Sequence, residues 1–278
     1  TTNFTSSSLS RWRVVSEGDP GVLSGTVSNF TLRNGVFKYY LNDTSTNADL
    51  YCTAVGNDAN GGTTPVSPKL TLTNLLASAD LEPGDILYID TGVYRSTGVP
   101  TWGVDDSGTA TNPVVIQCST NWVAGTPVFG SGWVAGGSIF DRQGGANGLI
   151  FSNASHVVLR GLVVTGSQVG VTIRNSTGIR LEQCAMRALT DAGVSVLNSS
   201  SITLFRVASY LNSSNGVRVQ ASTNVALQHS VIWRNGDAGV AVLSGTASIS
   251  NSVVASSVSR APLYRLGTPT NLTGNFNN

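Results

Sequence analysis

The second half of the chain repeats one pattern of apolar and polar positions every 22 or 23 residues. The pattern starts at a recurring glycine, found at Gly148, Gly170, Gly193, Gly216 and Gly239. An apolar residue follows each glycine, and another stands two positions later, as in a β-strand with one buried face. These apolar pairs are Leu149 and Phe151, Val171 and Ile173, Val194 and Val196, Val217 and Val219, and Val240 and Val242.

Two more short apolar stretches follow in each repeat. The second strand is predicted at Val157 and Leu159, Ile179 and Leu181, Ile202 and Leu204, Val225 and Leu227, and Ala247 and Ile249. The third is predicted at Leu162 and Val164, Cys184 and Met186, Val207, and Ile232. Three short strands in each repeat describe one coil of a parallel β-helix, which buries its apolar face only when coils stack. The LxxLxLxxN pattern of leucine-rich repeats, which have a similar period, is missing.

Asparagine is frequent in the turn between the first two strands. The position five residues after each repeat glycine holds Asn153, Asn175, Asn198, Ala221 and Ser244. Two explanations stand: stacked asparagines hydrogen-bond along the column, or asparagine simply tolerates the turn conformation.

The composition agrees with a turn-rich, all-β protein. Hydrophobic residues make up 40% of the 278 residues, charged residues only 11%, and glycine occurs 31 times. The formal net charge of +1 gives no broad attraction to nucleic acid or to anionic membranes. No apolar run reaches the roughly 18 residues of a membrane span, so we expect no membrane insertion. Thr1 to Ser10 lack the regions of a signal peptide.

A stretch upstream of the repeat resembles the first segment of extracellular right-handed β-helix proteins. The sequence GNDANGGTTPVSPKLTLTNLLASADLEPGDILYIDTGVY matches the pattern GxDxNxGTSPxxPxxTLxxAL followed by PGDxIYVxxGxY. The resemblance implies an all-β, right-handed parallel β-helix with a short capping helix at Leu70 to Ala79 and a first coil beginning at Ile86 to Ile89. Because that family includes polysaccharide lyases, epimerases, adhesins and surface proteins, it implies the fold better than an activity.

Two domains are expected on this basis. Residues 1–40 form an N-terminal segment or the remnant of a preceding domain, and residues 41–278 form the parallel β-helix. The stretch Asn271 to Asn278 resembles a connector to a further coil. We therefore expect a β-helix that is truncated at its C-terminal end, in a fragment of a larger protein.

The three cysteines and one acidic turn are candidates for cross-links or metal binding. Cys184 falls on an inward position and is expected to be a buried apolar residue. Cys52 and Cys118 could form a disulfide in an oxidising compartment. The turn at Asp58 offers its carboxylate and nearby carbonyls to calcium, but has fewer acids than a calcium loop, and a plain turn explains the same residues.

Arginines and aromatic residues are the strongest candidates for ligand contact. Arg187, Tyr210 and Trp233 share one column, which could stack sugar rings and hold acidic groups. Tyr210 and Trp233 could equally pack beneath a covering loop. Arg206 and His229 share a second column, with Glu182 one position earlier on a lower coil, and these three are the catalytic candidates.

Few acids are available for the paired carboxylates of a glycosidase. Asp191 and Asp237 share a turn column two coils apart, where a role as turn residues explains them.

Three functions remain open. The first is a non-catalytic extracellular or cell-surface module that contacts polysaccharide or serves as a spacer. The second is part of a polysaccharide lyase or epimerase that acts on uronic-acid polymers. The third is self-association through the end coils into dimers or filaments.

Overall fold

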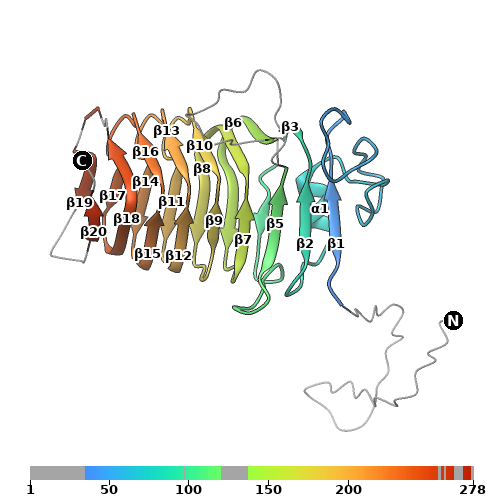
Figure 1. The fold of residues 1–278 in the computed structure, drawn as a ribbon, viewed down its shortest axis with the longest axis horizontal. Coiled ribbons are helices and arrows are strands. Elements are labelled where there is room, and N and C mark those ends of the chain that lie inside the picture. Colours follow the sequence, from blue (N-terminus) through green and yellow to red (C-terminus); the bar gives the residue numbers. More distant parts are fainter. Residues whose placement is uncertain are drawn as a thin grey trace, which may run out of the picture. The chain divides into compact units, whose positions relative to one another are not determined.

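The computed structural model of the protein describes residues 35–96, 98–119, 137–255, 258–259, 261–265 and 272–276. Val36–Asn278 forms one compact unit. The described strands stack along one axis, and every recorded pairing between them is parallel (Figure 1). Most of the expected segment 1–40 lies outside the described residues, so the boundary at residue 40 stays a prediction.

The strands form three parallel ladders, which the chain visits in turn. The first ladder comprises β1 (Lys38–Leu41), β2 (Ile86–Ile89), β5 (Val114–Cys118), β7 (Val157–Arg160), β9 (Arg180–Glu182), β12 (Ser200–Phe205), β15 (Ser222–Gln228), β18 (Gly245–Ala255) and β20 (Leu272–Phe276). The second comprises β3 (Gly92–Arg95), the first parts of β6 (Ser138–Ser152) and β8 (Leu162–Arg174), β10 (Ala185–Arg187), β13 (Ala208–Tyr210), β16 (Val231–Trp233) and the end of β18. The third comprises β4 (Thr101–Trp102), the ends of β6 and β8, β11 (Val194–Leu197), β14 (Val217–Gln220), β17 (Val240–Val242) and β19 (Leu263–Arg265).

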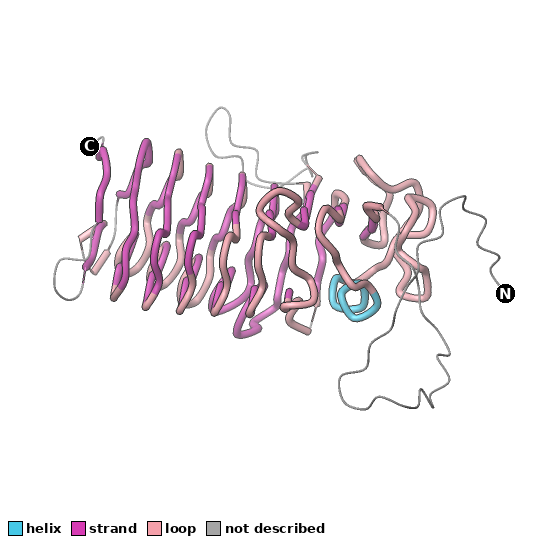
Figure 2. The backbone as a smooth tube through the Cα atoms, turned by 90° about the horizontal axis from the view of Figure 1, so that it is seen from below, coloured by secondary structure: helices cyan, strands magenta, loops and turns pink. Residues whose placement is uncertain are grey.

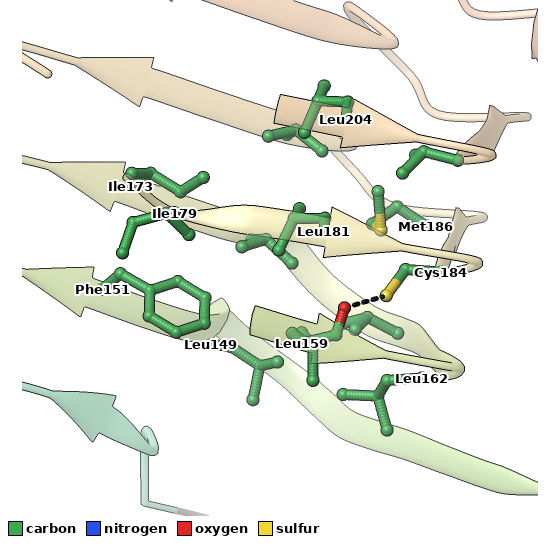
Figure 3. Close-up of a cluster of buried hydrophobic side chains, with 14 of the residues drawn as sticks. Leu149, Phe151, Leu159, Leu162, Ile173, Ile179, Leu181, Cys184, Met186 and Leu204 are labelled. Carbon is green, nitrogen blue, oxygen red and sulfur yellow. Dashed lines mark hydrogen bonds between the residues drawn. The ribbon is translucent and has the colours of Figure 1, made fainter. Parts of the chain in front are cut away.

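The apolar positions of the repeat form one continuous core. Val217 pairs with Val194 on one coil and with Val240 on the other, and all three side chains are fully buried. The second and third strands contribute equally, as Figure 3 shows for Leu159, Leu181 and Cys184. The predicted inward positions are therefore confirmed in all three ladders.

The repeat glycines are required for space rather than for a left-handed backbone. None of the five has a positive φ. A Cβ atom on Gly216 would lie 2.3 Å from the Ile232 Cγ2 and 2.6 Å from the Gly239 carbonyl oxygen. The equivalent atom on Gly193 would lie 2.6 Å from the Gly216 carbonyl oxygen. Each glycine thus lets the chain pass close to the next coil.

A single left-handed residue joins the first ladder to the second in successive coils. This column consists of Gly161, Gln183, Arg206, His229 and Asn251, each with positive φ. A comparable column follows the second ladder at Gly166, Ala188, Leu211 and Arg234. Side chains at these corners lie on the outside, where Arg206, His229 and Arg234 are exposed.

The asparagine column expected to hydrogen-bond along the helix is exposed instead. Asn153, Asn175 and Asn198 have positive φ and are exposed, and no side-chain hydrogen bond joins them to one another within the described residues. The turn-conformation explanation therefore accounts for this column. The amide side chains point outward because the left-handed residue turns the chain there.

Buried polar ladders occupy other columns. Asn212 Oδ1 accepts a hydrogen bond from the Leu189 N–H at 3.2 Å. Asn235 Oδ1 in turn accepts two hydrogen bonds from Asn212, one from its backbone N–H at 3.2 Å and one from its Nδ2 at 3.0 Å. A serine ladder follows the exposed asparagines: Ser199 Oγ accepts the Ser176 N–H, and Ser222 Oγ accepts the Ser199 N–H. These side chains satisfy backbone N–H groups that would otherwise be buried without a partner.

The described residues include one helix, α1 (Leu72–Ser78), which belongs to the N-terminal part of the stack (Figure 2). It is shorter than the predicted Leu70 to Ala79 because Thr71 caps it, with its hydroxyl accepting the Asn74 N–H. Leu72 and Leu75 are buried in the continuous core. The first coil begins earlier than the predicted Ile86, because β1, which precedes Ile86 in the chain, already pairs with β2.

Candidate functional site

Two groups of arginines and aromatic residues lie on the outer faces of neighbouring ladders. The Trp233 surface comprises Arg187, Tyr210, Trp233 and Arg234. The Phe205 surface comprises Arg160, Arg180, Glu182, Phe205, Arg206 and His229. The Trp233 surface lies on the second ladder. The Phe205 surface lies on the first ladder and at the corner that follows it.

The Trp233 surface has the register that the sequence predicted. Arg187 pairs with Tyr210, and Tyr210 pairs with Trp233, so the three residues occupy successive coils. The Arg234 Cζ stands 4.6 Å from the centroid of the Trp233 ring. Arg187 and Trp233 are partly exposed and Arg234 is exposed. Both ends of the column therefore offer groups that a ligand can touch.

Tyr210 differs from its neighbours because it is buried. Its relative exposure is 5%, and it packs in an apolar cluster with Ile139, Val163 and Ala185. Burial raises the pKa of Tyr210 to about 12, against the opposing charge of Arg187. Trp233, on the next coil, packs against this cluster, and Tyr210 itself does not present a ring face to solvent.

An ion-pair cluster forms the core of the Phe205 surface. Glu182 Oε2 accepts the Nε–H of Arg160, and Glu182 Oε1 accepts the Nε–H of Arg180. Register places Arg160, Glu182 and Phe205 in one outward column on successive coils. The pairing therefore crosses from one coil to the next.

Phe205 connects this cluster to the two other catalytic candidates. The Arg180 Cζ lies 4.9 Å and the Arg206 Cζ 5.2 Å from its ring centroid. The His229 ring meets Phe205 edge-on at 5.5 Å between centroids. Such contacts between cations and aromatic rings are typically favourable. The structure thus gathers Glu182, Arg206 and His229 around residues that the sequence analysis missed.

The missed residues carried a signal in the repeat register. Arg160 and Phe205 stand at the position of Glu182 one coil before and one coil after it, and Arg180 precedes Glu182 by two positions on the same outer face. Aligning all outward positions by the 22- or 23-residue repeat would have placed these four residues together.

The electrostatics of Glu182 favour a role in holding the Arg160 and Arg180 side chains. Partial burial raises the pKa of Glu182, but the hydrogen bonds and charges of Arg180 and Arg160 outweigh burial, and the net pKa is lowered. Both carboxylate oxygens are engaged. Glu182 is therefore an ionised anchor at neutral pH and is not poised to donate a proton.

The other acids of the coils have structural partners. Arg218 donates to both carboxylate oxygens of Asp191, at 3.2 and 3.0 Å. Asp237 Oδ2 accepts a hydrogen bond from Asn215 Nδ2 at 3.2 Å. The backbone N–H groups of both aspartates also donate hydrogen bonds to carbonyl oxygens of the same turn in the neighbouring coil. This agrees with their assignment as turn residues.

Asp58 holds the start of α1. Its Oδ1 accepts the N–H groups of Leu70 and Thr71, and its Oδ2 accepts the Thr71 hydroxyl and Asn74 Nδ2. Partial burial raises the pKa of Asp58, but these hydrogen bonds prevail and lower it. No group of three or more metal-binding side chains occurs among the described residues. The geometry therefore explains Asp58 as a turn and capping residue.

Asp49 and Asp90 organise the loop before the first coils. The Asp90 carboxylate accepts the backbone N–H groups of Leu50, Tyr51 and Cys52. Asp49 Oδ2 accepts Asn42 Nδ2 at 2.6 Å, while its Oδ1 is buried without a hydrogen-bond partner. Burial raises the pKa of Asp49 to about 6; the Asn42 hydrogen bond opposes this, and the charge of Asp90 adds to it.

The three cysteines are free and buried. The Cys52 sulfur faces the Leu41 carbonyl oxygen at 3.8 Å, and Cys118 ends β5 in the core. The disulfide considered for this pair is therefore absent. Cys184 is a buried core residue, as predicted, and burial raises its pKa to about 12.

Comparison with known families and structures gives consistent results. A family model described as "Right handed beta helix region" matches residues 129–276, more than half of the chain. No helix in the described part of the chain has the length and apolar character that crossing a bilayer requires. A search of curated protein sequences gave no match.

Two solved structures share the fold at low sequence identity. Pectate lyase Pel9A is 16% identical with a TM-score of 0.59, over 78% of this chain and 54% of that chain. ORF18 of Geobacillus virus E2 is 13% identical with a TM-score of 0.53, over 65% of this chain and 38% of that chain. The chain thus spans about half or less of their length, and the likeness concerns the fold alone.

Proposed function

The chain belongs to the right-handed β-helix family, and from this premise we propose that it is a polysaccharide-contacting module of a larger extracellular protein. The Trp233 surface carries the proposal. An aromatic ring flanked by arginines suits a sugar ring that bears acidic groups, because the ring stacks on the apolar sugar face and guanidinium groups pair with carboxylates. The shared fold with a pectate lyase supports a glycan as the partner.

The rigidity of the surface supports binding. Trp233 rests beside the buried Tyr210, and Arg234 already lies over its ring. Groups held in place before binding lose little conformational entropy when a ligand arrives. The repeat also places Arg187 and Trp233 two coils apart, roughly 9–10 Å, so a chain ligand along the helix axis would meet both.

Affinity electrophoresis with polygalacturonate, alginate, chondroitin sulfate and neutral dextran tests this proposal. We expect retardation by at least one uronic-acid polymer, and its loss in Trp233→Ala. Tyr40→Ala is the matched control, since Tyr40 is a partly exposed aromatic residue on β1 that stacks on Tyr88. Equal mobility of wild-type protein in every gel would refute the proposal, as would equal losses in both variants.

A second candidate function is part of a lyase or epimerase for uronic-acid polymers. The observation that favours it is the meeting of Arg206 and His229 on Phe205, which offers a cation for the substrate carboxylate and an imidazole as base. A lyase would then convert pectin, alginate or glycosaminoglycans to unsaturated products that absorb at about 235 nm, whereas an epimerase would invert a sugar stereocentre without forming such products. His229→Ala should abolish that absorbance, and turnover that persists in this variant would exclude His229 as the base.

A further inference from the structure

The carboxylate of Glu182 holds two arginines from neighbouring coils, each through its Nε–H. Arg160 extends from β7 and Arg180 from β9, and each donates its Nε–H to a different oxygen of the one carboxylate. The Glu182 side chain is 15% exposed, whereas those of Arg160 and Arg180 are 40% and 37% exposed. The carboxylate therefore lies beneath two guanidinium groups that reach the surface.

This arrangement leaves the terminal nitrogens of both arginines available. A guanidinium has five N–H donors, and the Nε–H uses only one. Within the described part of the chain, no hydrogen bond is recorded from Nη1 or Nη2 of Arg160 or Arg180. Arg180 is further held by its position over the Phe205 ring. Both groups are thus oriented but not saturated.

The local charge is positive despite the carboxylate. Arg160 and Arg180 pair with Glu182, and Arg206 lies over the Phe205 ring next to it in the column. This part of the surface therefore carries three guanidinium groups and one carboxylate. An anion that approaches Arg160 and Arg180 would meet two planar donor forks whose side-chain freedom is already restricted. Planar forks of this kind match carboxylate, sulfate and phosphate oxygens in bidentate geometry.

We propose that Arg160 and Arg180 form a binding site for a single oxyanion group, with Glu182 as the positioning residue. The shared chemistry is that of a carboxylate or sulfate. This site lies on the first ladder, apart from the Trp233 surface, and it does not depend on the polysaccharide proposal.

The test follows the arginine Nε–H resonances of ¹⁵N-labelled protein while sodium sulfate or sodium acetate replaces sodium chloride at constant ionic strength. We expect the Arg160 and Arg180 resonances to shift and saturate, with the more strongly bound anion identifying the ligand class. Arg174 is the internal control, because it is an exposed arginine whose side chain hydrogen-bonds only to Ser152 Oγ among the described residues. Equal, non-saturating shifts at Arg174 would show adventitious ion binding only and overturn the site.

Two variants separate geometry from charge. Arg160→Lys keeps the charge but loses the fork, and should weaken anion binding roughly ten-fold. Glu182→Gln removes a negative charge, so simple electrostatics would strengthen binding, whereas loss of positioning should weaken it. Tighter binding in Glu182→Gln, or unchanged binding in Arg160→Lys, would refute the proposal. Trp233→Ala should retain anion binding, which separates failure of this site from failure of the Trp233 surface.

Discussion

Asn212 and Asn198 offer a direct comparison of a buried and an exposed asparagine in the same repeat. Asn212 is 2% exposed; its Oδ1 accepts the Leu189 N–H, and its Nδ2 donates to Ser209 Oγ and Asn235 Oδ1 at 3.0 Å each. Asn198 is exposed and left-handed, with φ of 48°. The two substitutions Asn212→Ala and Asn198→Ala therefore remove the same atoms from different environments.

The expected losses follow from these contacts. Asn212→Ala leaves the buried Leu189 N–H without its partner, which costs about 1–3 kcal/mol. It also removes the side-chain hydrogen bonds to Ser209 Oγ and Asn235 Oδ1. We expect a loss of about 3 kcal/mol, or roughly 6–12 °C in Tm. Asn198→Ala should cost less than about 1 kcal/mol, because Ala221 already occupies the same column with φ of 47°.

Thermal melts by circular dichroism, together with urea denaturation at 25 °C, give both values. Amide hydrogen exchange adds a local measurement, since protection of the Leu189 N–H should fall in Asn212→Ala alone. If Asn198→Ala proved as damaging as Asn212→Ala, the exposed column would carry a stabilising ladder and the distinction drawn from burial would be wrong.

Three further outcomes are expected. Val217→Asp buries a carboxylate without a partner and should cost about 3–5 kcal/mol in urea denaturation, against less than about 1 kcal/mol for the exposed Gln220→Asp; equal losses would mean that the strand register is off by one. Gly216→Ala should lower the free energy of unfolding by about 2–3 kcal/mol, because the added Cβ has no room. In the control Gly103→Ala the added Cβ has no neighbouring atom within 4 Å, so this variant should be nearly neutral; a harmless Gly216→Ala would contradict the crowding argument. The folded-state pKa of Asp49, about 6, lies above its unfolded value of about 3.8, so the folded state binds the extra proton and Asp49 adds stability as pH falls from about 6 towards about 4. Asp49→Asn should therefore raise Tm at pH 7 and reduce the difference in Tm between pH 5 and pH 7; an unchanged difference in Tm would argue against this role.

The fold was largely predictable because its information is local and repeated. Alternation marks the inward face of Val194 and Val196, and the return of the same pattern one coil later identifies the partner strand. The repeat glycine was identified as well, and the structure gives its reason: a side chain at that position would crowd the next coil.

The candidate site was predictable only in part. Register alone placed Arg187, Tyr210 and Trp233 in one column, and the structure confirms this column. Register did not show that Tyr210 is buried in an apolar cluster with Ile139, Val163 and Ala185, because these three residues come from three successive earlier coils.

The sequence by itself determined which residues face the core, because a period of two within each strand and of 22 or 23 between coils leaves one consistent inward set. Tertiary structure decided the fate of the polar residues. Whether a turn asparagine is buried, like Asn212, or exposed, like Asn198, depends on the backbone conformation of that turn and not on its residue type. The capture of Arg160 and Arg180 by Glu182 likewise depends on side-chain geometry between coils, where long flexible side chains have many alternative partners and only the packed surface selects one.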